Sequence, residues 1–289
     1  MIEMTIGSAL ALLRMTPRDR ALVEVLNELR YLTTAQVREV CYPSASAETT
    51  SNRLTILHRR GVLACLTHRA FDDRRAFWCL APLGRAAAGS LAGSPADGPR
   101  ACALAAVQMD HLIATNQVFC DLCAQCRAGR LGPFRWFGSH HACVDLGETR
   151  VVPDAVILAV ASGGDVWSYW LELDRGTMAP AALAAKLRRY RALRQLAGLR
   201  RHEPVWEARA ASWVLFACPD ARRAALGAQV AAECGLERFW AGTASELPAS
   251  LAQSIGPDLI PPVDSLPGFP GGVVSPAAPV TMIGKEALR

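Results

Sequence analysis

Lysine is almost missing from this sequence of 289 residues. Lys186 and Lys285 are the only lysines among 31 lysine and arginine residues, so nearly every fixed positive charge is an arginine. A lysine kept inside a folded segment, as Lys186 is, therefore becomes a candidate for a specific role.

Long apolar runs are missing too. No uninterrupted stretch reaches the roughly 20 residues that a helix needs to cross a bilayer, so we expect no membrane partner. A short apolar stretch near the start follows the acidic Glu3 and is not followed by a small-residue cleavage pattern, so we expect no signal peptide and a cytoplasmic location. In a reducing cytosol the ten cysteines are expected as small buried hydrophobic residues without disulfides.

The first third of the chain has the pattern of three helices followed by a β-hairpin. Residues 17–41 predict two helices, because Pro17 suits a first helical position and apolar residues recur at helical spacing. Residues 46–60 predict a third helix, and two apolar runs around the charged turn at 71–75 predict the hairpin. We therefore predict a winged helix-turn-helix domain over residues 14–85.

Such a domain predicts double-stranded DNA as the partner. Its third helix is narrow enough to enter the major groove, and the tip of the hairpin reaches the neighbouring phosphates. A net charge of +5 is compatible with this partner. The alternative is a protein–protein module whose arginines form a solvated face. The predicted DNA-binding residues, on the outward face of the third helix and near the hairpin tip, are Thr49, Thr50, Asn52, Arg53, Arg60, Arg69, Arg74 and Arg75.

The rest of the chain predicts a second domain. Residues 86–100 are rich in small residues, glycine and proline and are typical of a linker or a loose helix end. Helical and buried-strand patterns then alternate, which predicts an α/β domain over residues 101–255 and an α+β fold for the whole chain. The tail, residues 256–289, is rich in proline and glycine, and we expect it to be extended or disordered.

Acidic residues gather on two successive predicted strands of the α/β domain. Asp154 begins one strand, and Glu172 and Asp174 end the next. A hairpin would bring Asp154 and Glu172 together, and two converging carboxylates can hold Mg²⁺ or Mn²⁺. The following helix carries Lys186 and, four residues later on the same face, Tyr190. These five residues are the candidate catalytic group, with Asp154 and Glu172 as candidate metal ligands.

The segments PDA, LELDRGT and KLRRY around this acidic group, with RDRALVEVLNELRYLTTAQV and NRLTILHRRGVL before them, resemble the replication-relaxation family. The resemblance covers most of residues 14–220. It implies a winged helix followed by a restriction-endonuclease-like domain of the PD-(D/E)xK type, and a role in replication or DNA relaxation of a plasmid or other mobile genetic element.

The sequence departs from an active nuclease of that type in two places. Asp174 stands two residues after Glu172, where an active member has lysine, although Lys186 could substitute for that lysine from the helix. The family also tends to place a glutamate shortly after a tryptophan upstream of the PD motif, whereas no acidic residue is close to Trp136 in this sequence.

Three functions follow from these features. We favour a DNA-binding regulator or accessory factor with an inactive nuclease-like domain, for which DNA binding needs no cofactor. The alternatives are a metal-dependent DNA nuclease and an adaptor that links a DNA site to a partner protein. Replication, relaxation or transposition proteins of the same element are candidate partners, and a homodimer is left open.

Two further patterns allow weaker hypotheses. Cys120, Cys123 and Cys126, with Cys143 and the pair His140 and His141 downstream, have zinc ligand types. We favour buried thiols, since cysteines three apart in a helical pattern line one face of a helix. A basic run either follows DNA phosphates or is a solvated helix face, and it consists of Lys186, Arg188, Arg189, Arg191, Arg194, Arg200 and Arg201.

Overall fold

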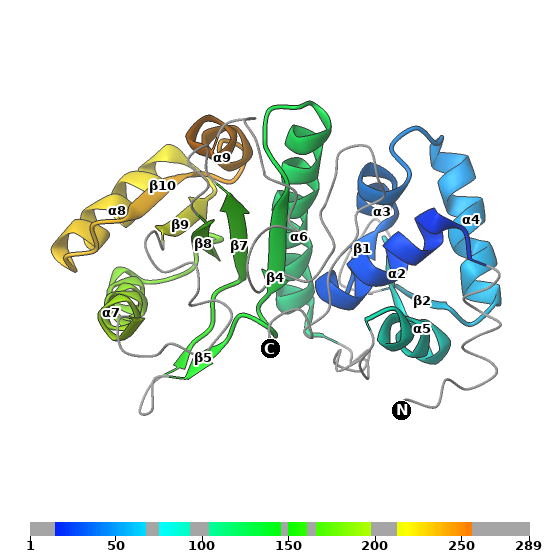
Figure 1. The fold of residues 1–289 in the computed structure, drawn as a ribbon. Coiled ribbons are helices and arrows are strands. Elements are labelled where there is room, and N and C mark those ends of the chain that lie inside the picture. Colours follow the sequence, from blue (N-terminus) through cyan, green and yellow to red (C-terminus); the bar gives the residue numbers. More distant parts are fainter. Residues whose placement is uncertain are drawn as a thin grey trace. The chain divides into compact units, whose positions relative to one another are not determined.

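The computed structural model describes residues 15–67, 75–92, 104–145, 150–160, 166–197 and 213–255 (Figure 1). The described residues fall into two compact units, which divide after Arg127. No helix within the described ranges has both the length and the apolar character that crossing a bilayer requires. The tail predicted at 256–289 lies outside the described residues.

The first unit begins with the predicted three helices and hairpin, which are confirmed. The elements are α2 (Pro17–Leu29), β1 (Leu32–Thr33), α3 (Thr34–Cys41), α4 (Ala47–Arg59), β2 (Leu63–Thr67) and β3 (Ala76–Leu80). Each helix begins after a hydroxyl residue that accepts a bond from the backbone of the first turn: Thr16, Thr33 and Ser46. Gly61 follows α4 with a φ of 71°, a conformation that costs glycine little.

The three strands of the first unit form an antiparallel sheet in the order β1-β3-β2. Leu22 and Leu26 of α2, Leu54 and Leu57 of α4 and Phe77 of β3 are all almost fully buried, so the helices and the hairpin share one core. Burial of these side chains is what holds α4 against the rest of the unit.

Two further helices, α5 (Pro82–Ala92) and α6 (Ala106–Arg127), belong to the first unit. Residues 86–92, expected in a linker or a loose helix end, form the second part of α5, where Ala87 and Ala88 are buried. α6, expected at the start of the second domain, is tied to the first unit instead. Its Asn116 side chain donates to the carbonyl oxygens of Leu29 at 3.1 Å and Tyr31 at 2.7 Å. The boundary between the two units therefore lies at the end of α6.

The second unit is a mixed five-stranded sheet with helices on both faces, as predicted for an α/β arrangement. The strands are β4 (Phe134–Gly138), β7 (Ala155–Val160), β8 (Val166–Leu173), β9 (Trp213–Cys218) and β10 (Phe239–Thr243), in the order β10-β9-β8-β7-β4. β4, β7 and β8 are antiparallel neighbours, whereas β8, β9 and β10 run parallel. A short ribbon joins β5 (Val144–Asp145) to β6 (Arg150–Val151).

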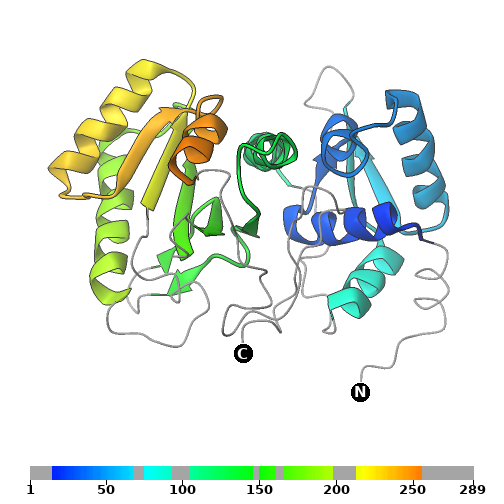
Figure 2. The ribbon, with the colours of Figure 1, turned by 45° about the horizontal axis from the view of Figure 1, so that its top comes forward.

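Alternation along the strands gives this sheet two different faces. Trp170 and Phe216 lie on the face covered by α7 (Pro180–Ala197) and α8 (Ala221–Glu233), where Leu183 and Leu187 complete a large apolar core. Trp213 and Trp240 lie on the opposite face and line a pocket together with residues of α9 (Leu247–Ile255). Figure 2 shows α9 on the other side of the sheet from α7 and α8. α9 was not predicted from the sequence.

Candidate functional site

Asp154 and Glu172 are brought together by the β7–β8 hairpin. The register pairs Ala155 with Leu171, so Asp154 lies opposite Glu172 on the neighbouring strand. The backbone fixes Asp154 in two ways: its N–H donates to the Leu171 carbonyl at 2.9 Å, and its Oδ2 accepts from the Leu173 N–H at 2.7 Å. The second bond holds the carboxylate at the end of β8.

Glu172 is 3% exposed, and both of its carboxylate oxygens have partners from α7. Lys186 donates from Nζ to Oε2, and Tyr190 donates from its hydroxyl to Oε1. Because the two donors are four residues apart, they share one face of the helix. Tyr190 is itself held edge-on against Trp170, with ring centroids 6.0 Å apart. We call Asp154, Glu172, Lys186 and Tyr190 the Glu172 cluster.

The electrostatics of the Glu172 cluster are those of a site with surplus negative charge. Burial raises the pKa of Glu172 to about 7, and the charge of Asp154 adds to the rise, while Lys186 and Tyr190 oppose it. Burial alone would lower the pKa of Lys186, but the charges of Glu172 and Asp154 outweigh it and raise that pKa. The lysine is therefore held charged by two carboxylates, and Glu172 can hold a proton near neutral pH.

Asp174 has its own set of partners. Its Oδ2 accepts from Nε of Arg223, a residue of α8 that the sequence reasoning missed, and its Oδ1 accepts from the Gly176 N–H at 3.1 Å. Nothing in the sequence pattern linked Arg223 to Asp174, because 49 positions separate them. The predicted group of five candidates is thus divided: four form the Glu172 cluster, and Asp174 pairs with an arginine.

The Glu172 cluster is a poor match for a divalent cation in this arrangement. A cation at Glu172 would have to displace the bonds from Lys186 and Tyr190, and Asp154 has one oxygen occupied by the backbone. Within the part of the chain that the structure describes, the carboxylates of Asp154, Glu172 and Asp174 do not form a set of three ligands within 4.8 Å of one another. Lys186 already supplies a positive charge to Glu172.

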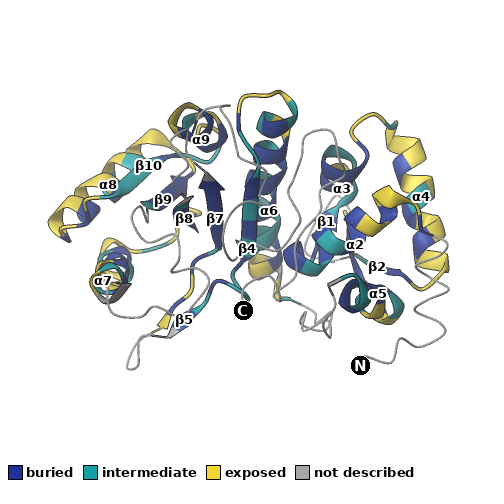
Figure 3. Ribbon diagram, in the orientation of Figure 1, coloured by how far each residue is buried: buried dark blue, intermediate teal, exposed yellow. Residues whose placement is uncertain are grey.

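In the first unit, the outer side of α4 is exposed (Figure 3). Thr49, Asn52 and Arg60 lie on it as predicted, and Arg75, which comes just before β3, is also exposed. Two of the predicted DNA-binding residues on this helix are turned inward. Thr50 is fully buried and its hydroxyl donates to the Ser46 carbonyl at 3.0 Å, while Arg53 turns inward to an ion pair. Arg69 and Arg74 lie outside the described residues.

The partner of Arg53 is Asp19 of α2, whose side chain is completely buried. The guanidinium donates from Nε to Oδ1 at 2.8 Å and from a second nitrogen to Oδ2. Tyr42 donates its hydroxyl to Oδ1 at 2.9 Å, and Thr16 donates its N–H and its hydroxyl to Oδ2 at 2.7 and 2.8 Å. We call these four residues the Asp19 network.

The Asp19 network keeps its carboxylate charged. Burial would raise the pKa of Asp19, but the hydrogen bonds from Arg53, Thr16 and Tyr42 outweigh it and hold the pKa below its ordinary value. The capping-box part, Thr16 with Asp19, is readable from the sequence, since the two residues are three apart at a helix start. The network joins α4 to α2 and to the end of α3.

Comparison with known proteins decides the family. The chain matches the sequence model of the replication-relaxation family over residues 23–204, which is more than half of its length. The chain belongs to the replication-relaxation family. Neither the curated proteins nor the solved structures contain a match to it.

The replication-relaxation match runs from α2 to beyond α7, so it includes the whole Glu172 cluster and Arg53. Strands β9 and β10 and helix α9 come after it. The aromatic residues Trp213 and Trp240 on those strands are therefore features of this chain that the family match does not cover.

Two weaker hypotheses can also be compared with this structure. Cys120, Cys123 and Cys126 are buried in α6, and burial raises the pKa of each thiol, that of Cys126 to about 12. Within the described residues these three cysteines do not belong to any group of three possible metal ligands within 4.8 Å of one another.

In the basic run, Arg188, Arg189 and Arg191 are exposed on α7, and Arg191 donates to the Cys234 carbonyl at 3.1 Å. Lys186 is committed to Glu172. Arg200 and Arg201 lie outside the described residues.

Proposed function

We propose that this protein is a DNA-binding accessory factor or regulator of replication or DNA relaxation on a plasmid or other mobile element. Residues 15–80 would act as a winged helix-turn-helix that places α4 in the major groove of double-stranded DNA. The observation that carries this proposal is α4 itself: one side packs into the core and is fixed by the Asp19 network, and the other side offers Thr49, Asn52 and Arg60 to a partner.

The role of Arg53 in this proposal is to position α4. Base readout requires that the reading helix hold its side chains in a fixed register. A bidentate arginine–carboxylate pair gives such geometric precision, because the planar guanidinium meets both oxygens. Base contact is then left to the exposed Asn52, whose amide can pair bidentately with adenine, and phosphate contact to Arg75 and Arg60.

The test measures how tightly the protein binds duplex DNA that carries the origin of its own mobile element. Asn52→Ala should weaken specific binding by about 1–3 kcal/mol and relax base preference, whereas Arg75→Ala should weaken binding to all sequences and reduce the salt slope by about one unit. Arg222→Ala, an exposed arginine of the second unit, is the matched control and should change neither. Unchanged affinity and salt slope in both first-unit variants, with the fold intact, would contradict the proposal.

We further propose that the second unit is a nuclease-like domain that has lost cleavage and serves as a scaffold. Two of its acidic residues already have cations from within the unit: Glu172 pairs with Lys186 and also accepts from Tyr190, and Asp174 pairs with Arg223. A buried carboxylate with its own cation and hydrogen-bond donors is tolerated without a bound metal.

The second candidate function is metal-dependent DNA cleavage, which is favoured by the position of Asp154 opposite Glu172 with Lys186 in contact. The experiment is nicking of supercoiled plasmid with Mg²⁺ or Mn²⁺, using Asp154→Ala and Lys186→Ala as controls. We expect no nicking. Metal-dependent nicking that both substitutions eliminate would replace the scaffold proposal with the nuclease.

A further inference from the structure

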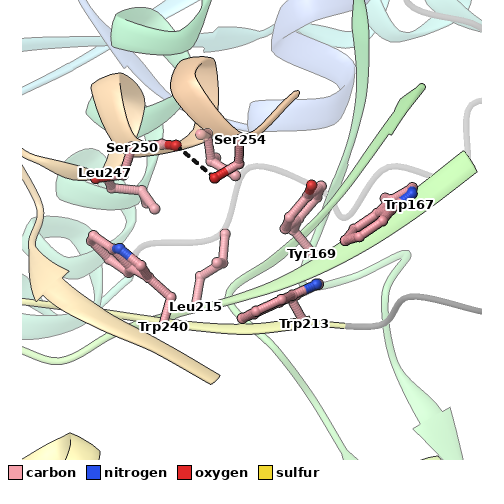
Figure 4. A pocket seen from close by; sticks show the side chains of 9 residues that line it. Trp167, Tyr169, Trp213, Leu215, Trp240, Leu247, Ser250 and Ser254 are labelled. Atoms are coloured by element: carbon pink, nitrogen blue, oxygen red, sulfur yellow. Dashed lines mark hydrogen bonds between the residues drawn. The ribbon is translucent and has the colours of Figure 1, made fainter. Parts of the chain in front are cut away.

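A small aromatic pocket lies on the face of the second sheet opposite the Glu172 cluster. Three of the seven tryptophans in the chain line it, Trp167, Trp213 and Trp240, together with Tyr169, and α9 contributes Ser250 and Ser254 (Figure 4). We propose that this aromatic pocket holds one unpaired base of single-stranded DNA. The inference rests on the proposed function, because the DNA of a plasmid or other mobile element exposes unpaired bases only where its two strands separate.

The strand register explains how these rings meet. Tyr169 of β8 pairs with Trp213 of β9, and Leu215 of β9 pairs with Trp240 of β10. Side chains two apart on a strand share a face, so the rings form a row across three neighbouring strands. Helix α9 covers one side of this row and leaves the pocket beside it.

Gly242 gives Trp240 the room to lie in this position. Gly242 is two residues after Trp240 and on the same face of β10. A Cβ atom there would meet the Trp240 ring at 2.5 Å. A side chain of any size at this position would force the Trp240 ring to move, so the glycine and the tryptophan act together to shape the pocket.

The size and chemistry of the aromatic pocket suit a single flat, neutral ring system. Its volume is about 170 Å³, well below the roughly 300–1,000 Å³ of sites that take drug-sized ligands. None of the described residues that line it is charged. A nucleotide's phosphate would therefore stay outside, and only its base would enter.

The rings of the pocket offer surfaces for stacking rather than a charged contact. A base has two π faces, so it can stack on an indole. An aliphatic side chain has no π face and would gain apolar contact alone.

The experiment compares two short single strands of equal length, oligothymidine and an abasic strand with the same phosphates. The full chain should bind oligothymidine more tightly, and its tryptophan emission should change on binding, since three tryptophans line the pocket. Trp240→Ala should weaken oligothymidine binding roughly 5- to 150-fold and leave abasic binding unchanged. Trp240→Phe should retain most of the affinity, because a ring remains.

If Trp240→Ala does not fold, a variant that fills the pocket provides a second test. Ser250→Leu adds bulk to the pocket from α9 without touching the sheet, and should give the same loss. Gln253→Leu, exposed on the same helix and outside the pocket, is its matched control and should bind as the wild type does. Equal affinity of the wild type for oligothymidine and the abasic strand, or full affinity in Ser250→Leu, would overturn the inference.

Duplex binding separates this inference from the proposed function. If the wild type binds origin duplex and does not distinguish oligothymidine from the abasic strand, the pocket inference fails and the first-unit proposal stands. If it binds oligothymidine through the pocket but no duplex, the pocket inference stands and the first-unit proposal fails.

Discussion

Each unit contains a buried carboxylate with the same kinds of partner. Asp19 in the first unit accepts from Tyr42 and Arg53, and Glu172 in the second unit accepts from Tyr190 and Lys186. The pKa values nevertheless move in opposite directions. That of Asp19 falls below its ordinary value, and that of Glu172 rises to about 7.

The difference comes from what surrounds the shared pattern. Burial raises the pKa of both acids, but Asp19 gains two more donors from Thr16 that help to outweigh burial, whereas Glu172 gains a second carboxylate, Asp154, that adds to it. Extra donors favour the charged form of an acid, and a neighbouring negative charge disfavours it. Hydrogen bonds from a tyrosine and a cation therefore do not by themselves decide whether a buried acid is protonated. The first unit uses its acid as a fixed structural link, and the second unit keeps one that can exchange a proton near neutral pH.

The largest effect should come from breaking the Asp19 network. Arg53→Ala leaves the buried carboxylate of Asp19 without its cation, and loss of one partner of a buried ion pair costs about 3–5 kcal/mol. Urea unfolding at neutral pH measures the change in the free energy of unfolding. Asn52→Ala, the exposed neighbour on the same helix, is the control and should stay within about 0.5 kcal/mol of the wild type. A loss below about 1 kcal/mol for Arg53→Ala would show that Asp19 does not depend on the pair.

The two acids also show what a sequence can predict. Local patterns gave the helices, the hairpin and the meeting of Asp154 with Glu172, because neighbouring strands and helical spacing are short-range features. The helical pattern predicts Arg53 on the outer face of α4. Its partner, Asp19, is 34 positions away, so no local sequence pattern indicates the ion pair. The same reason hid the pair of Asp174 with Arg223 and the aromatic pocket, which depends on the register of strands far apart in the chain.

The next effect concerns the pH dependence of the second unit. An acid whose pKa is raised from 4.5 to about 7 on folding binds its proton more tightly in the folded state, so between these values the free energy of unfolding falls as pH rises. The stabilisation is complete below pH 4.5 and lost above about 7. Glu172→Gln removes this titration, and the wild type should lose on the order of 2 kcal/mol more than the variant over that range.

Urea unfolding at a series of pH values compares the wild type with Glu172→Gln. Glu237→Gln, which removes an exposed carboxyl outside the Glu172 cluster, serves as the control and should follow the wild-type profile. Parallel profiles for the wild type and Glu172→Gln would mean that burial and the charge of Asp154 do not raise the pKa of Glu172 as inferred.

The smallest effect compares the two tyrosine hydroxyls directly. A hydrogen bond to a charged group contributes roughly 1.5–3 kcal/mol and a neutral one about 1 kcal/mol. Asp19 is charged at both pH 6 and pH 8, so Tyr42→Phe should cost about 2 kcal/mol at each pH. Glu172 is mostly protonated at pH 6 and mostly charged at pH 8, so the cost of Tyr190→Phe should be about 1 kcal/mol at pH 6 and should grow by roughly 1 kcal/mol at pH 8.

Both substitutions remove one oxygen from a buried ring, so each serves as the control for the other. A cost for Tyr190→Phe that is the same at both pH values would mean that Glu172 is held charged as Asp19 is, and the contrast between the two units would disappear.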